Sequence, residues 1–161
     1  MNNILEVKDL TMHYETIDGD VEAVKNISFN IKAGESFGIV GESGCGKTSV
    51  AMSLLQLQAE NGKISNGSIL FDGIELVGMS ENDLRKVRWD GMSIVFQGAM
   101  NAWNPVVKIG EQIREAMREH YPESSKSQNT DKINELFTMV GLDPLVADRF
   151  PHELSGGMKQ R

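Results

Sequence analysis

One short segment constrains this chain more than any other feature of its 161 residues. Residues 41–48 read GESGCGKT and fit the pattern G-x-x-x-x-G-K-[ST] at every required position. The apolar run at 36–40 precedes the segment and predicts a buried strand, and helical spacing afterwards predicts a helix from Lys47 to Gln58. A glycine-rich turn between a strand and a helix indicates a P-loop in an α/β fold.

The residue types in this segment explain how it would hold phosphate. Glycines let successive backbone N–H groups point at phosphate oxygens, and the start of a helix adds positive partial charge. Lys47 is expected to reach the β- and γ-phosphates and Thr48 to ligate Mg²⁺, so ATP and Mg²⁺ are the expected ligands. A glycine-rich turn that carries a lysine by chance is the alternative. The predicted phosphate-binding residues are Gly41, Glu42, Ser43, Gly44, Cys45, Gly46, Lys47, Thr48 and Ser49.

The composition is that of an ordinary globular chain and excludes several classes of protein. Lys and Arg number 16 and Asp and Glu number 23, giving a net charge of −7. An acidic chain argues against nucleic-acid binding, which needs a basic face. The single cysteine, Cys45, excludes an internal disulfide, and no apolar run reaches the ~18 residues of a membrane span. With no signal-peptide pattern at the N-terminus, we expect an intracellular chain that meets a membrane only through a partner.

The pattern before Gln97 predicts strands and one short helix. Apolar residues alternate with polar ones between Leu5 and Ile31, and the pair Asp72-Gly73 between two apolar runs indicates a hairpin. Ser80 has the spacing of a helix cap, so a short helix through residue 87 is expected. The run at 92–96 predicts a second buried strand.

The remainder of the chain is predicted to be helical. Apolar residues at helical spacing predict one helix around 109–117 and another around 133–140, the second capped by Thr130. The polar stretch 121–129 is expected to be a surface loop. We therefore expect a nucleotide-binding α/β part with antiparallel strands at 1–97 and a helical part at 98–161.

A second anion site is predicted at residues 154–160, which read LSGGMKQ. Ser155 offers a hydroxyl, and Gly156 and Gly157 offer free N–H groups at the start of a helix. Taken alone, a Ser-Gly-Gly run is more often a flexible turn. Together with the P-loop it indicates a second group that touches phosphate.

The P-loop, Gln97 at the end of an apolar run and LSGGMKQ, in this order, resemble the ATP-binding subunits of ABC transporters over the whole chain. The resemblance implies an α/β P-loop NTPase fold of the ABC type, with an antiparallel β subdomain and a helical subdomain. It implies that Gln97 is catalytic and contacts Mg²⁺ and the attacking water. It also implies that Tyr14 stacks on adenine, although a strand aromatic packed in a core is an equal alternative.

A narrower resemblance, to the dipeptide/oligopeptide importer branch, rests on residues 96–105, 109–112 and 149–155. That branch commonly has Asp-Pro after the glutamine, where this chain has Gly98-Ala99. The resemblance implies peptide uptake at the cytoplasmic face of a membrane, through transmembrane permease subunits and, indirectly, an extracytoplasmic peptide-binding protein. It also implies a head-to-tail pair of ATP-binding subunits, with Ser155, Gly156 and Gly157 over the partner's γ-phosphate.

Hydrolysis by a P-loop enzyme needs an Asp that holds Mg²⁺ and a group that orients water. In the resembled family the Asp, a Glu and a later His follow the LSGG motif, and the 161 residues contain none of these motifs. We therefore expect the N-terminal portion of a longer ATPase subunit, which binds ATP without hydrolysing it alone. A soluble ABC-type ATPase outside transport and a non-catalytic nucleotide-binding module remain the alternatives.

Overall fold

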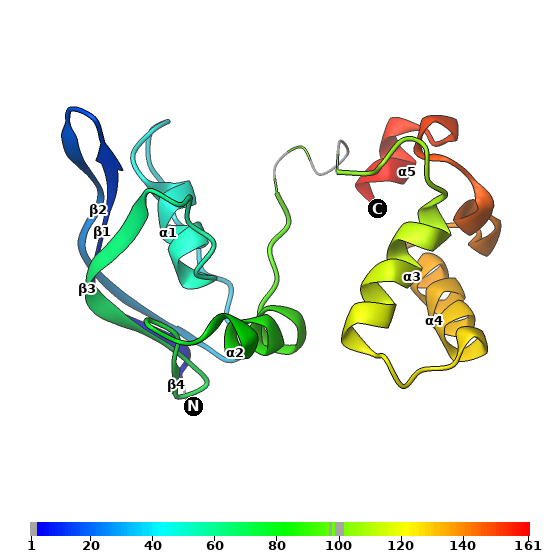
Figure 1. Cartoon of the computed structure of the whole chain (residues 1–161), viewed down its shortest axis with the longest axis horizontal. Helices are drawn as coiled ribbons and strands as arrows, with labels where there is room; N and C mark the ends of the chain where they lie inside the picture. The colour runs from blue at the N-terminus through cyan, green and yellow to red at the C-terminus, as the bar shows by residue number, and fades with distance from the viewer. Residues whose placement is uncertain (1–2, 97, 99–101) are drawn as a thin grey trace. The chain divides into compact units, whose positions relative to one another are not determined.

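The structure is a computed structural model that describes residues 3–96, 98 and 102–161. These residues form two compact units, one up to Ser93 and one from Ile94 onward. Figure 1 shows strands and α1 in the first unit and helices in the second. No helix among the described residues is both long enough and apolar enough to cross a bilayer.

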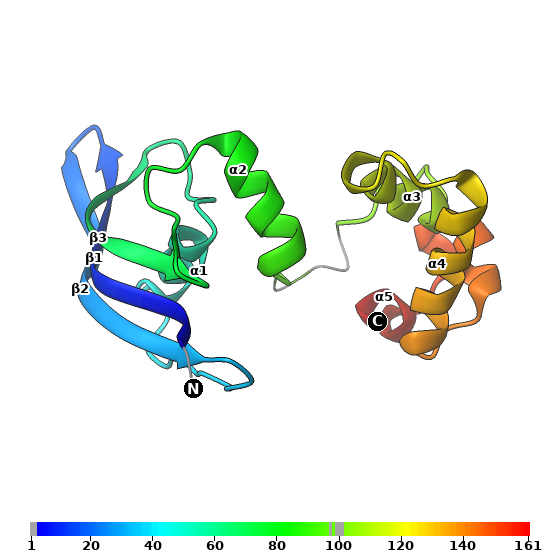
Figure 2. The same cartoon turned by 90° about the horizontal axis from the view of Figure 1, so that it is seen from below.

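The first unit is built on an antiparallel sheet whose strand order is β2-β1-β3-β4. The strands expected between Leu5 and Ile31 are confirmed as a long hairpin (Figure 2). The bounds are β1 Asn3–Thr16, β2 Gly19–Lys32, β3 Gly62–Phe71 and β4 Ile74–Glu75.

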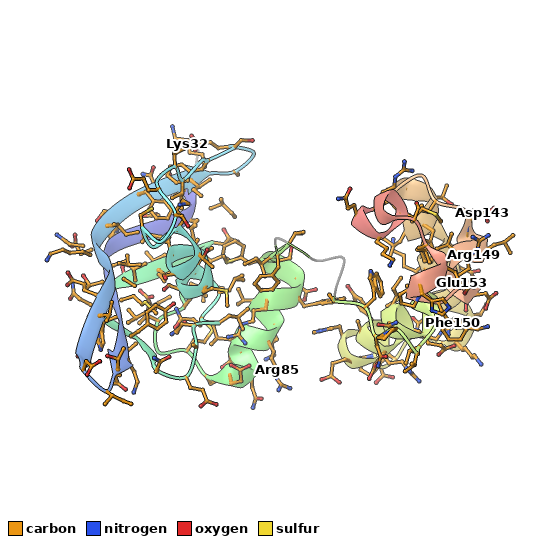
Figure 3. The ribbon with its side chains drawn as sticks, turned by 90° about the horizontal axis from the view of Figure 1, so that it is seen from above. Lys32, Arg85, Asp143, Arg149, Phe150 and Glu153 are labelled. Atoms are coloured by element: carbon orange, nitrogen blue, oxygen red, sulfur yellow. The ribbon has the colours of Figure 1, made fainter. Side chains whose placement is uncertain are left out.

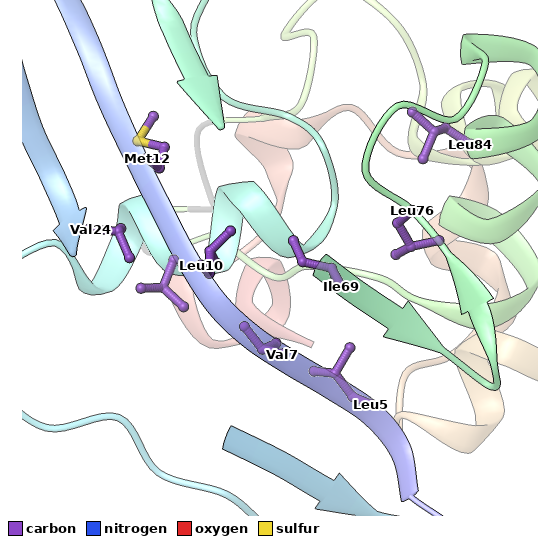
Figure 4. Close-up of a cluster of buried hydrophobic side chains, with 9 residues drawn as sticks. Leu5, Val7, Leu10, Met12, Val24, Ile69, Leu76 and Leu84 are labelled. Atoms are coloured by element: carbon purple, nitrogen blue, oxygen red, sulfur yellow. The ribbon is translucent and has the colours of Figure 1, made fainter. Parts of the chain in front are cut away.

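The core of the first unit lies on one face of this sheet, and a bulge in β1 keeps that face apolar (Figure 4). Leu5 and Val7 alternate inward, the pairing shifts register after Val7, and Leu10 and Met12 then continue on the buried face. Gly67 on β3 lets the bulged part of β1 approach β3 closely, because an added Cβ would lie 2.5 Å from the Lys8 oxygen.

The hairpin predicted at Asp72-Gly73 is confirmed. Both residues have positive φ, 47° and 78°, and Phe71 pairs with Ile74 across them. Two positive φ values are what a two-residue turn needs to match the twist of the strands that it joins.

The short helix predicted after Ser80 is confirmed as α2, Glu81–Lys86, followed by a π-helical turn, η1, at Val87–Gly91. The Ser80 hydroxyl accepts a hydrogen bond from the Asp83 backbone N–H, as a helix cap does. The same hydroxyl donates to the Asp83 carboxylate and, with Lys86, lowers the pKa of Asp83.

The second unit packs helices around its own core. The helices are α3 Ile109–His120, α4 Lys126–Met139, η3 Pro144–Asp148, η4 Pro151–Glu153 and α5 Gly156–Gln160. Figure 3 labels Arg149, Phe150 and Glu153 in the stretch before α5, where the Phe150 backbone N–H donates to Glu153 at 2.6 Å. The buried core residues are Ile109, Met117, Ile133, Phe137, Val146 and Leu154.

The predicted start of α4 was wrong. Thr130 lies inside the helix, and Ser125 caps it through a reciprocal pair of hydrogen bonds with Gln128. Part of the predicted loop 121–129 is therefore helix, and Asn129 is buried. The polar, serine-rich composition of the stretch concealed a capping box.

Two predicted strands are also absent. Residues 36–40 and 92–96 have no regular structure, and Val40 and Val95 are almost fully exposed. A strand needs a neighbour for its backbone groups, and neither run pairs with any strand in the described part of the chain. The helix after the P-loop is shorter than expected as well, because α1 ends at Leu54 and Gln56 has a φ of 52°.

Candidate phosphate-binding site

The P-loop is held against the sheet at Gly46. This residue is the N-cap of α1, Lys47–Leu54, and has a φ of 93°. An added Cβ would lie 2.3 Å from the backbone oxygen of Ala23 on β2. Because only glycine tolerates both conditions, the glycine before Lys47 fixes where the loop meets the strand. α1 packs on the sheet through the buried Val50.

The Lys47 side chain turns back over its own loop. Its Nζ donates to the backbone oxygen of Gly41 at 2.8 Å and also to that of Glu42. An ammonium group has three N–H donors, and the third donates to the Sγ atom of Cys45 at 3.5 Å. Sulfur is a weak acceptor, so a phosphate oxygen would compete well for this donor.

The start of α1 offers backbone donors without competition. No side chain caps this end, and the first turn contains no acidic residue. The first bond along the helix is from the Val50 N–H to the Gly46 oxygen at 2.9 Å, so the N–H groups of Lys47, Thr48 and Ser49 have no helical acceptor. Free N–H groups, an ammonium and the positive end of a helix fit a phosphate group.

Thr48 is exposed in the first turn of this helix, so its hydroxyl can reach a divalent cation beside the phosphates. Among the described residues no group of three or more His, Cys, Asp and Glu side chains could hold a metal ion.

Cys45 is exposed and packs on the first glycine of the loop. A Cβ added to Gly41 would come within 2.6 Å of the Cys45 Sγ. Both ends of the loop are thus packed: Gly41 lies against the Cys45 thiol, and Gly46 lies against β2.

Tyr14 lies on β1 and is half-buried. Its hydroxyl lies 3.2 Å from the Ser49 Oγ on α1, and its ring packs against the core of the first unit. The packing of the ring agrees with the alternative of a strand aromatic in a core, and the contact with Ser49 joins the sheet to the P-loop helix. Stacking of Tyr14 on adenine stays a prediction.

Ser155 caps α5 in the second unit. Its Oγ accepts a hydrogen bond from the Met158 backbone N–H at 3.3 Å. Gly156 and Gly157 have ordinary φ values, and a Cβ added to either would meet nothing within 4 Å. Neither backbone conformation nor packing inside this unit therefore requires glycine at these positions.

Gln97, predicted to be catalytic and a Mg²⁺ ligand, lies outside the described residues. The P-loop lies in the first unit and the LSGG segment in the second, so the structure brings together only the residues of 41–49 with Tyr14. The sequence pattern missed Ala23, whose backbone oxygen shapes the loop. A main-chain contact of this kind leaves no trace in residue type.

Comparison with known families shows which family the chain belongs to. Residues 24–161 match the ABC transporter family. The chain belongs to this family. That membership confirms the predicted family and the predicted α/β P-loop NTPase fold of the ABC type.

Several relatives that match the chain are named for peptide transport. The oligopeptide transport ATP-binding protein OppD of Haemophilus influenzae is 40% identical over 100% of this chain and 50% of its own length. OppD of Escherichia coli is 41% identical over 98% of this chain and 47% of its own. The dipeptide transport ATP-binding protein DppD of Lactococcus lactis is 38% identical over 98% and 46%. The chain thus spans about half the length of these relatives.

Solved structures show the same fold. The ATP-binding cassette MJ0796, in a dimer in a post-hydrolysis state bound to ADP and Pi, is 28% identical. It has a TM-score of 0.80, with 97% of this chain and 65% of that chain covered. The agreement places the antiparallel sheet, the P-loop helix and the helical unit within one known architecture.

Proposed function

We propose that this chain is the nucleotide-binding part of an ATP-binding subunit that powers the uptake of dipeptides or oligopeptides. The observation that carries the proposal is the start of α1, where three backbone N–H groups have no helical acceptor and the third donor of the Lys47 ammonium meets only the weak acceptor Cys45 Sγ. Such an arrangement binds the phosphates of a nucleotide.

Different groups of the loop bind different parts of MgATP. The backbone N–H groups of 41–49 and the Lys47 ammonium bind phosphate oxygens, and the Thr48 hydroxyl takes one position on Mg²⁺. Gln97 is proposed as the second protein ligand of Mg²⁺ and as the residue that orients water. ATP supplies the phosphoanhydride bond whose hydrolysis in the longer subunit drives transport.

The LSGG segment is proposed to act on a second subunit. Gly156 and Gly157 are glycines that nothing in their own unit requires, and open space above them allows another molecule to approach the backbone closely. We propose that Ser155 and these two glycines meet the γ-phosphate held by a partner subunit. The MJ0796 cassette, described as dimeric, supports an arrangement of this kind.

Peptides are the proposed cargo because the OppD and DppD relatives carry that description. Uptake then involves transmembrane permease subunits, an extracytoplasmic peptide-binding protein and a position at the cytoplasmic face of the membrane. Gly98-Ala99 replaces the Asp-Pro that is common in this branch, and this departure bears on the cargo more than on the nucleotide.

The proposal is tested by labelled-peptide uptake in cells whose only copy of the gene carries Lys47→Ala. We expect loss of dipeptide or oligopeptide uptake with unchanged uptake of an unrelated sugar. Lys25→Ala, which removes an exposed lysine that pairs only locally with Glu22, is the matched control and should leave uptake unchanged. Normal peptide uptake by the Lys47→Ala strain would contradict the proposed function.

A further inference from the structure

Arg88 ties the end of α1 to the π-helical turn after α2. Its Nε donates to the Leu55 oxygen at 2.7 Å and its Nη2 to the Gln56 oxygen at 2.7 Å. Its Nη1 pairs with the Glu81 carboxylate at 2.8 Å, and the side chain is 17% exposed. Three groups of a planar, rigid fork are thus engaged at once.

The carbonyl groups at the end of α1 need hydrogen-bond donors from outside the helix. The last carbonyl groups of a helix have no intrahelical donors, and helices often end on a glycine in the left-handed region. Here Gln56 occupies that region with a φ of 52°, and the last turn of α1 contains no basic residue. The backbone N–H groups of Gln56 and Leu57 bond the Ser53 and Met52 oxygens. Arg88 supplies donors to the next two carbonyl groups, those of Leu55 and Gln56, and places a positive charge at the negative end of the helix.

The two ends of α1 are therefore fixed by separate contacts. At the start, Gly46 lies against the backbone oxygen of Ala23. Just beyond the end, Arg88 donates hydrogen bonds to two backbone carbonyl groups. The helix has 8 residues and is about 12 Å long. A helix this short has little stability of its own, so the direction of its first N–H groups depends on both contacts.

We propose that Arg88 is a positioning residue for the phosphate site and acts on it through α1. The inference rests on the proposed function, since it assigns the phosphates of a nucleotide to the start of this helix. Without Arg88 the carbonyl groups of Leu55 and Gln56 lose their side-chain donor, the end of the helix is less fixed, and the N–H groups at its start bind phosphate less well.

The test measures the Kd for MgATP by calorimetry in the full chain, at a temperature where circular dichroism shows each variant to be folded. Arg88→Gln should raise the Kd about tenfold. Arg88→Lys should raise it about threefold, because one ammonium cannot reach both carbonyl groups as the fork does. Arg85→Gln should change it less than about twofold, since the Arg85 side chain on α2 is 64% exposed (Figure 3).

A second control separates positioning from stability. Ile69→Val opens a small cavity in the core on β3 and should lower the melting temperature while leaving the Kd of the folded chain unchanged. If Arg88→Gln lowers the melting temperature and keeps the wild-type Kd, Arg88 is structural only and the inference is overturned.

The remaining outcomes also decide the matter. If Arg88→Gln does not fold, Arg88→Lys decides in its place: a raised Kd supports positioning, and a wild-type Kd overturns it. A wild-type chain that fails to bind MgATP, or that binds no better than Lys47→Ala, overturns the proposed function and this inference with it.

Discussion

The α-carbon of Gly46 lies so close to the backbone oxygen of Ala23 that an added Cβ would come within 2.3 Å of it. Gly46→Ala should therefore move the P-loop off β2 as well as strain the residue, whose φ is 93°. We expect the free energy of unfolding to fall by more than the ~1–3 kcal/mol of backbone strain alone. Urea unfolding followed by circular dichroism measures this loss.

Gly44→Ala is the matched control for that variant. Gly44 has a similar φ of 83°, but an added Cβ would meet nothing within 4 Å. Gly44→Ala should lower the free energy of unfolding by the cost of the backbone conformation alone, because no atom collides with the added Cβ. Equal losses in the two variants would mean that the contact between Gly46 and Ala23 does not shape the loop.

Cys45 reports occupancy of the loop. Its Sγ packs against Gly41 and lies 3.5 Å from the Lys47 Nζ, so bound phosphates should cover it. MgATP should slow alkylation of Cys45 in proportion to site occupancy, AMP should protect far less, and Lys47→Ala should abolish the protection. Mass spectrometry gives a clear result, because Cys45 is the only thiol.

That prediction has a direct counter-result. If saturating MgATP leaves the alkylation rate unchanged in a chain that is separately shown to bind it, the loop does not enclose phosphate. Nucleotide must be raised to high concentration before a lack of protection is accepted.

The parts of the structure that follow local rules could be predicted from the sequence. The start of the helix at Lys47, the Asp72-Gly73 turn and the Ser80 cap each depend on a few neighbouring residues, and all three are as expected. The runs 36–40 and 92–96 have the apolar composition of buried strands, but a strand also needs a partner. Composition alone could not show that none of the described residues pairs with them.

Helix ends were harder to predict, because several residues compete to be the cap. Thr130 and Ser125 both have suitable side chains, and only Ser125 has a glutamine three residues later that completes a capping box. The end of α1 depends on Arg88, which lies more than 30 residues away along the chain. Long-range contacts of this kind leave no local pattern.

The 161 residues by themselves should not hydrolyse ATP. They contain no motif that supplies the Asp and Glu that hydrolysis in this family needs. Release of phosphate by the wild-type chain should equal release by Lys47→Ala in a coupled assay. Steady turnover that Lys47→Ala abolishes would require a catalytic group that the sequence pattern did not reveal.

The exposed apolar run at 36–40 should drive self-association. Val40 is 96% exposed, and Phe37, although stacked on Phe29, is 44% exposed. Val40→Lys should reduce association in sedimentation velocity, whereas Val106→Lys, at an exposed position in the second unit, should reduce it less. A compact wild-type monomer with slow amide exchange throughout 36–40 would refute this prediction.

Isothermal titration of the chain with MgATP tests the central claim most directly, because the claim is that residues 41–49 and the Lys47 ammonium hold nucleotide phosphates. The wild-type chain should bind MgATP saturably at one site, and Lys47→Ala, which removes the ammonium donor, should weaken binding by at least about tenfold. Equal affinity in the two proteins, both shown to be folded, would contradict the claim.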